Sequence, residues 1–366
     1  MSNPAASTLS LDRELLEIGT RIRDYLLSSR YLARFRPAHL EHAVYAYLRA
    51  GGKALRPAML LWSCALAGGD QHVALPAAAA LEVYHTWTLV HDDIIDRDDR
   101  RRGSPTVHED LRGKGVSELG LSPLAAEHYG RSIAVLAGDS QHAWGISLFT
   151  EAHRERGADA SLILSLIEEL ENEVLNAIAE GETLDLQLSC RPIEEISEEQ
   201  IIHMLAQKTA ALYRFAARAG AMIGLNRYQP EHPLVETLAR FAYGCGIAFQ
   251  VQDDILGLLG ADEELGKPVG SDLREGKRTV ILHHAWAQAD AQARALLKQV
   301  VGNSAASEQE LAKATRLLDQ LGGIARAREL AQRHLDDSLA SLAALPSSPE
   351  RDRLAQLAQR MVDRRK

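Results

Sequence analysis

Apolar residues recur at helical spacing along almost the whole chain. Leu9, Leu16, Ile22 and Leu26 follow this pattern near the start, and a comparable run begins at Leu205. No convincing stretch alternates apolar and polar residues in the way that is typical of a half-buried strand. The pattern therefore predicts an all-α protein.

Signals for helix starts agree with this interpretation. Ser197 is followed by Gln200 and Ser307 by Glu310, and this spacing indicates a capping box at the start of a helix. The segments that interrupt the pattern are short and lie at about 51–53, 100–105, 225–233, 259–276 and 346–349. Because no low-complexity linker divides the chain, we expect a single domain that spans residues 1–366.

Composition and charge exclude several classes of protein. Hydrophobic residues make up 46% of the 366 residues and aromatic residues only 5%, which favours helices over sheets. The formal net charge is -9 and no predicted helix carries a basic face, so we expect no nucleic-acid partner. Residues 1–9 do not resemble a signal peptide, and no apolar run approaches the roughly 18 residues of a membrane span. We expect a cytoplasmic protein without a transmembrane segment.

The three cysteines form neither a CxxC motif nor a Cys/His pattern. Cys64, Cys190 and Cys245 are far apart in the sequence, so no disulfide framework or zinc site is indicated. We interpret all three as buried thiols in a reducing compartment.

Two predicted helices are apolar nearly all round, which indicates that they lie in the interior. They span about 77–90 and 234–251, and each leads into a pair of aspartates. Acidic groups beside a buried helix are costly unless a cation compensates their charge. Composition alone does not explain this arrangement.

The first acidic motif is Asp92-Asp93-Ile94-Ile95-Asp96. Asp92 and Asp96 are four residues apart, so on a helix they share one face and can hold a hard cation together. The second motif, Gln250 to Gly257, contains Asp253 and Asp254. Two such motifs facing each other suit Mg²⁺ and a diphosphate. The alternatives are a solvated acidic helix end and a chance acidic pair.

Basic residues near these motifs could bind the phosphate oxygens. They follow the acidic motifs or lie in loops, and they are Lys53, Arg56, Arg100, Arg101, Arg102, Lys208, Lys267 and Lys277. Each of them by itself is also compatible with ordinary surface charge.

In these motifs the chain resembles the trans-isoprenyl diphosphate synthases, which make geranyl, farnesyl, geranylgeranyl and longer prenyl diphosphates. The resemblance runs from about Gly51 to Thr279. It includes both aspartate motifs, GGKALRP, RRRG, Lys208-Thr209 and GKPVGSDLREGKRT. It implies an isoprenoid-synthase domain, a helical bundle around a large central cavity, that condenses isopentenyl diphosphate with an allylic diphosphate such as dimethylallyl, geranyl or farnesyl diphosphate.

The resemblance also implies a role for individual residues. Three Mg²⁺ ions would be held by Asp92, Asp96 and Asp253. The allylic diphosphate would be bound by Arg101, Lys208, Gln250 and Lys267, and the diphosphate of isopentenyl diphosphate by Lys53, Arg56, His85 and Arg102. Thr209 and Lys277 are expected to assist in substrate binding. The residues expected to act in catalysis are Asp92, Asp96, Arg101, Lys208, Asp253 and Lys267.

The mechanism follows from the charges. Cations and basic side chains stabilise the departing diphosphate, an allylic carbocation forms, and the double bond of the partner attacks it. No protein nucleophile is needed, and the resemblance implies that the departed diphosphate removes the final proton, so we name no side-chain base. His85 lies seven residues before Asp92, and helix geometry therefore places both side chains on the same face of the predicted helix.

The sequence departs from the family's pattern at two positions. Gly257 stands where many relatives have the last aspartate of the second motif, so weaker binding of one Mg²⁺ is a hypothesis. Glu182 stands where glutamine is usual. We still expect activity.

In this family, product length depends on the size of the side chains that line the cavity about one helical turn before the first aspartates. Trp87 and Thr88 occupy these positions, and the indole should shorten the space for a growing chain. We therefore expect a C15–C20 product, with geranylgeranyl favoured over farnesyl. The alternative is that Trp87 merely packs against a neighbouring helix.

Three other functions remain as alternatives. A terpene cyclase would use the first motif but would not need Lys53, Arg56 and Arg102 for a second diphosphate. A partner subunit of a heteromeric, longer-chain synthase would usually lack aspartates that this chain keeps. A helical cation-binding scaffold leaves the basic loops unexplained. As the family is usually dimeric, we expect a homodimer.

Overall fold

The computed structural model describes residues 4–260 and 270–363. The chain forms two compact units, which interleave along the sequence. The first contains Met1–Ile167 and Ala219–Pro230, and the second contains Glu168–Arg218 and Glu231–Lys366.

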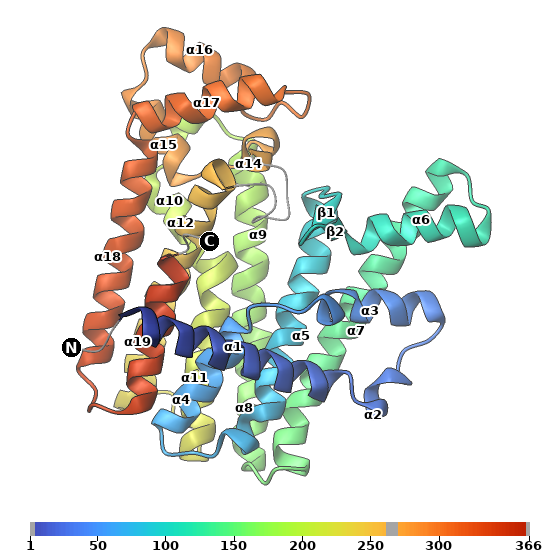
Figure 1. Ribbon diagram of the computed structural model, residues 1–366, viewed down its shortest axis with the longest axis vertical. Coiled ribbons are helices and arrows are strands. Elements are labelled where there is room, and N and C mark those ends of the chain that lie inside the picture. Colours follow the sequence, from blue (N-terminus) through green and yellow to red (C-terminus); the bar gives the residue numbers. More distant parts are fainter. Residues whose placement is uncertain (1–3, 261–269, 364–366) are drawn as a thin grey trace. The chain divides into compact units, whose positions relative to one another are not determined.

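The first unit is built around helix α5 (Gln71–Ile95), which packs against the long helix α7 (Pro123–Arg154), as Figure 1 shows. Helix α1 (Pro4–Leu26) contacts both α5 and α4. The other elements of this unit are α2 (Ser29–Leu32), α3 (Ala38–Ala50), α4 (Leu55–Leu66), β1 (Arg100–Arg101), β2 (Ser104–Pro105), α6 (Val107–Leu119) and most of α8 (Ala160–Glu169).

The second unit is built around helix α12 (Pro233–Leu259), which runs beside α18 (Gly323–Ala343) (Figure 1). Helix α11 (Ala211–Leu225) begins in this unit and ends in the first. The other elements are η1 (Leu170–Val174), α9 (Leu175–Ser189), η2 (Ile193–Glu195), α10 (Glu198–Leu205), η3 (Ala206–Ala210), α14 (Ser271–Glu275), α15 (Val280–Gln288), α16 (Ala291–Val300), α17 (Glu308–Gln320) and α19 (Pro349–Val362).

The prediction of an all-α fold is confirmed. Both capping boxes are present: the side chains of Ser197 and Ser307 accept hydrogen bonds from the backbone of Gln200 and Glu310, and each bond is returned. The two predicted apolar helices, 77–90 and 234–251, fall within α5 and α12, and most of the side chains of these two helices are buried. None of the helices in the described parts of the chain combines the length and apolar character that crossing a bilayer requires.

Two details differ from expectation. The segment around 100–105, predicted as a plain break, forms a small antiparallel hairpin in which Arg101 pairs with Ser104. Cys64 and Cys245 are buried as predicted, but Cys190 is exposed because it lies just beyond the end of α9.

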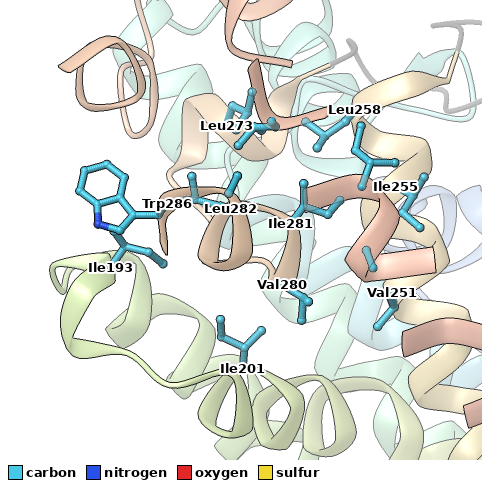
Figure 2. Close-up of a cluster of buried hydrophobic side chains, with 14 of the residues drawn as sticks. Ile193, Ile201, Val251, Ile255, Leu258, Leu273, Val280, Ile281, Leu282 and Trp286 are labelled. Carbon is cyan, nitrogen blue, oxygen red and sulfur yellow. The ribbon is translucent and has the colours of Figure 1, made fainter. Parts of the chain in front are cut away.

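The core of the second unit holds the acidic end of α12 in place (Figure 2). Val251, Ile255 and Leu258 are each at most 4% exposed and belong to the same buried cluster as Ile281 and Leu282 of α15. With about 100° between successive residues, these three apolar residues share one face of α12. Asp253 therefore projects from a different face, away from the core.

Candidate active site

The first acidic motif lies at the end of α5, and its geometry suits a hard cation. Asp92 is in the last turn, and Asp96 caps the helix with its backbone N–H donating to the Asp92 carbonyl at 2.8 Å. Carboxylate oxygens of Asp92 and Asp96 lie within 4.8 Å of each other, and both side chains are partly accessible. The structure thus brings this pair together as the four-residue spacing indicates. Carboxylate oxygens are hard ligands of the kind that Mg²⁺ prefers.

Asp93, the middle aspartate of the motif, is fully buried, unlike Asp92 and Asp96. Its Oδ2 accepts a hydrogen bond from the hydroxyl of Tyr47, and its Oδ1 accepts one from Nε of Arg101 at 2.7 Å. Burial raises the pKa of Asp93 to about 6, although the Arg101 guanidinium opposes the shift. Asp93 is therefore a structural anchor for Arg101, a role that its place in the motif does not reveal.

Arg101 lies among three carboxylates. Its Nη2 is 2.6 Å from Oδ1 of Asp93, 3.5 Å from Oδ2 of Asp92 and 3.7 Å from Oδ2 of Asp98. The turn of the hairpin sets the course of the backbone next to Arg101. Arg102 and Gly103 both have positive φ, of 52° and 76°, as a two-residue type I′ turn requires. This turn places Arg101 against the end of α5.

A second basic cluster forms between the loop before α4 and the side of α5. A Cβ placed on Gly52 would lie 3.0 Å from Oε1 of Glu82 and 3.2 Å from Nη2 of Arg102, so any larger residue here would crowd both side chains. Burial raises the pKa of Glu82, and the guanidiniums of Arg102 and Arg56 oppose the shift. Lys53 lies in the same loop and is exposed. Two of the four residues expected to bind isopentenyl diphosphate, Arg56 and Arg102, therefore lie near the carboxylate of Glu82.

His85 is the fourth of these residues. Burial lowers the pKa of His85 well below its ordinary value, and the positive charges of Arg56 and Arg102 lower it further. His85 is therefore neutral at physiological pH, and it would act as a hydrogen-bonding group and not as a cation.

Sequence reasoning missed Glu82. The signal was present, because Glu82 is the one acidic residue between Ala77 and Val90, a stretch without lysine or arginine. A carboxylate in an otherwise apolar stretch calls for a cationic partner.

In the second unit, Lys208 lies in the π-helical turn η3 and is held by two carboxylates. Its Nζ is 2.8 Å from Oε2 of Glu182 and 2.8 Å from Oδ2 of Asp185. The turn fits tightly against α9, since a Cβ on Gly181 would lie only 2.2 Å from the backbone nitrogen of Lys208. Glu182, noted as a departure, thus ion-pairs with a predicted site residue.

A chain of hydrogen bonds orients the second acidic motif. The hydroxyl of Thr209 donates to Oε1 of Gln250 at 2.8 Å, and Nε2 of Gln250 donates to Oδ1 of Asp254 at 3.2 Å. Burial raises the pKa of Asp254 well above its ordinary value, and the negative charge of Asp272 adds to the shift. Asp253 is the more accessible aspartate of the pair. The two predicted residues Thr209 and Gln250 are therefore brought together.

The space beside Gly257 holds a carboxylate from elsewhere in the chain. A Cβ on Gly257 would lie 2.8 Å from Oδ2 of Asp272, in helix α14. Lys277 reaches the same helix, with its Nζ 3.0 Å from Oε2 of Glu275 and 3.9 Å from Oδ1 of Asp272. The remaining predicted residue of this region, Lys267, lies outside the described residues.

The two residues expected to set product length lie on different faces of α5. Trp87 is roughly 140° from Asp92 around the helix, whereas Thr88 is only about 40° away. The indole of Trp87 packs against Tyr84, His91 and His142, with ring centroids 5.6, 5.9 and 5.2 Å away. Because His142 belongs to α7, the contact with a neighbouring helix that was the alternative reading does exist.

Comparison with known proteins identifies relatives of this chain. The family model for polyprenyl synthetase matches residues 37–318. A geranylgeranyl diphosphate synthase of Saccharolobus solfataricus is 34% identical over 329 residues, 89% of this chain and 91% of the relative. A farnesyl diphosphate synthase of Geobacillus stearothermophilus is 37% identical over 255 residues, 69% of this chain and 77% of the relative.

Among solved structures, one of a geranylgeranyl pyrophosphate synthase from Corynebacterium glutamicum, complexed with isoprenyl diphosphate and magnesium, is also similar. It superposes with a TM-score of 0.83 at 28% identity, covering 97% of this chain and 99% of the other.

Proposed function

The chain belongs to the polyprenyl synthetase family, and on that basis we propose that it condenses isopentenyl diphosphate with an allylic diphosphate, head to tail. It is a short-chain trans-prenyltransferase. The observation that carries this conclusion is the match over 37–318, which includes both acidic motifs and every basic cluster described above. Synthases of this kind are among its relatives, and nothing in these similarities favours a cyclase.

Enzymes of this family use Mg²⁺, and we propose that three ions are held by Asp92, Asp96 and Asp253. The separation of the Asp92 and Asp96 oxygens and the accessibility of Asp253 support this assignment. Bound Mg²⁺ would neutralise the diphosphate and stabilise it as a leaving group.

The predicted binding residues divide between the two substrates. Arg101, Lys208, Gln250 and Lys267 would bind the allylic diphosphate, with Thr209 holding Gln250 in orientation and Lys277 assisting. Lys53, Arg56, His85 and Arg102 would bind the diphosphate of isopentenyl diphosphate. The neutral His85 would donate a hydrogen bond, while Arg56 and Arg102 provide charge.

The groups assigned to the allylic diphosphate favour its departure, because donors fixed before the reaction need not reorganise as negative charge develops. Lys208 is an example, since Glu182 and Asp185 hold its ammonium group in one position. An apolar surrounding would protect the allylic carbocation from water until the second substrate attacks.

The product is a short-chain prenyl diphosphate, with geranylgeranyl favoured over farnesyl. We propose that Trp87 and Thr88 limit the chain. The packing of Trp87 against Tyr84 and His142 supports a rigid position for the indole.

We further propose a single cytoplasmic domain that forms a homodimer. Support for one domain comes from the interleaving of the two units along the chain and from a family match that extends over both.

One assay tests the proposed function. The protein is incubated with Mg²⁺, isopentenyl diphosphate and dimethylallyl, geranyl or farnesyl diphosphate, and the products are sized by chromatography. We expect C20 as the main product from at least one starter. Products longer than C20 would refute the assigned chain length, and no product with any starter would favour a partner subunit.

A further inference from the structure

A buried hydrogen bond connects the first acidic motif to a residue outside every motif. Tyr47 of α3 is 7% exposed, and its hydroxyl donates to Oδ2 of Asp93. The same hydroxyl accepts a hydrogen bond from the backbone N–H of Val107 at 3.2 Å. One phenol therefore joins α3, the end of α5 and the start of α6.

The two oxygens of Asp93 have different partners. Tyr47 holds Oδ2, while Oδ1 is 2.7 Å from Nε and 2.6 Å from Nη2 of Arg101. A carboxylate bound at both oxygens cannot rotate without breaking one of these contacts. The position of the Arg101 guanidinium thus depends on the bond at the far oxygen.

This arrangement matters because Arg101 adjoins the proposed cation ligands. Its Nη2 lies 3.5 Å from Oδ2 of Asp92. A long arginine side chain loses much conformational freedom when it binds an anion, and a chain that is already fixed loses less. Locking of this kind by surrounding hydrogen bonds is what keeps binding groups in a productive geometry.

We propose that Tyr47 is a positioning residue, which acts through Asp93 to hold Arg101 ready for the allylic diphosphate. The inference rests on the proposed function, because that function assigns the allylic diphosphate to Arg101. It makes a selective prediction: loss of the Tyr47 hydroxyl weakens binding of the allylic diphosphate and leaves isopentenyl diphosphate unaffected. A purely structural tyrosine would show no such selectivity.

The test is Tyr47→Phe with Tyr45→Phe as its matched control. Tyr45 is also buried in α3, and its hydroxyl donates to the backbone carbonyl of Tyr31 at 2.6 Å, a contact that includes no proposed site residue. Both variants lose one buried phenol hydroxyl from the same helix. Thermal melting shows whether their stabilities fall by similar amounts.

For Tyr47→Phe we expect the KM for the allylic substrate to rise about fivefold, since a hydrogen bond to a charged group is lost. The KM for isopentenyl diphosphate should stay within about twofold. Calorimetric titration with inorganic pyrophosphate and Mg²⁺ should show a similar loss of affinity without requiring turnover. Tyr45→Phe should change none of these quantities, and equal effects of both variants would overturn the proposal.

A double-mutant comparison identifies the route. In an Arg101→Lys background, Tyr47→Phe should have little further effect on pyrophosphate affinity, because the group that it positions is gone. An undiminished effect would refute action through Arg101. If Tyr47→Phe does not fold, Asp93→Asn takes its place, and an unchanged pyrophosphate affinity there contradicts the proposal. Inactive wild-type protein would instead count against the proposed function.

Discussion

Gly52 offers a sharp test of the proposed isopentenyl diphosphate site. It lies between Glu82 and Arg102, at distances of 3.0 and 3.2 Å from an added Cβ to Oε1 and Nη2, so these two atoms are at most 6.2 Å apart. Their attraction is on the order of 3 kcal/mol at an effective dielectric constant of about 20. The Gly52→Ala variant places a methyl group against both.

The backbone at Gly52 does not have positive φ, so alanine introduces crowding without backbone strain. Overpacking costs about 1 to 3 kcal/mol, and because both neighbours are the ends of flexible side chains we expect the lower value. If Arg102 moves to relieve the contact, about 1 kcal/mol of substrate binding is lost, which corresponds to about a fivefold rise in KM.

Steady-state kinetics with each substrate varied in turn measures this effect. The KM for isopentenyl diphosphate should rise, while the KM for the allylic substrate stays within about twofold. Gly113→Ala is the control, because it lies in α6 with no atom within 4 Å of its added Cβ. A folded Gly52→Ala protein with an unchanged KM for isopentenyl diphosphate, or with both KM values raised equally, would refute the reasoning.

Three further changes test other parts of the site. Trp87→Ala should shift the products towards longer chains, and an unmoved product distribution would contradict a role in chain length. Gly257→Asp should lower the melting temperature measured without Mg²⁺, since the Cβ of the new side chain would lie 2.8 Å from Oδ2 of Asp272 and crowd that carboxylate. Added Mg²⁺ should restore part of the lost melting temperature, and an unchanged melting curve would contradict this prediction. Lys208→Gln should cost about 1 to 3 kcal/mol of stability by leaving two carboxylates without their shared cation, and denaturant unfolding that matches wild type would show otherwise.

Local sequence patterns determined the helical fold and the identity of the acidic motifs. Helical periodicity and the capping boxes at Ser197 and Ser307 depend on residues only three or four positions apart, so the sequence states them directly. The pairing of Asp92 with Asp96 follows from the same helix geometry. Family resemblance then supplied the expected roles, again from motifs that are short and contiguous.

Tertiary structure decided which groups hold the site residues in place. Tyr47 meets Asp93 across 46 positions, and Lys208 meets Asp185 across 23, so no local periodicity could reveal either pair. The exposure of Cys190 and the carboxylate beside Gly257 depend on where helices end and on what packs there. The sequence by itself therefore determined the helices and the reactive residue types, because these arise from short-range geometry. The folded chain decided their partners, because burial and charge pairing act between residues that are far apart in the sequence.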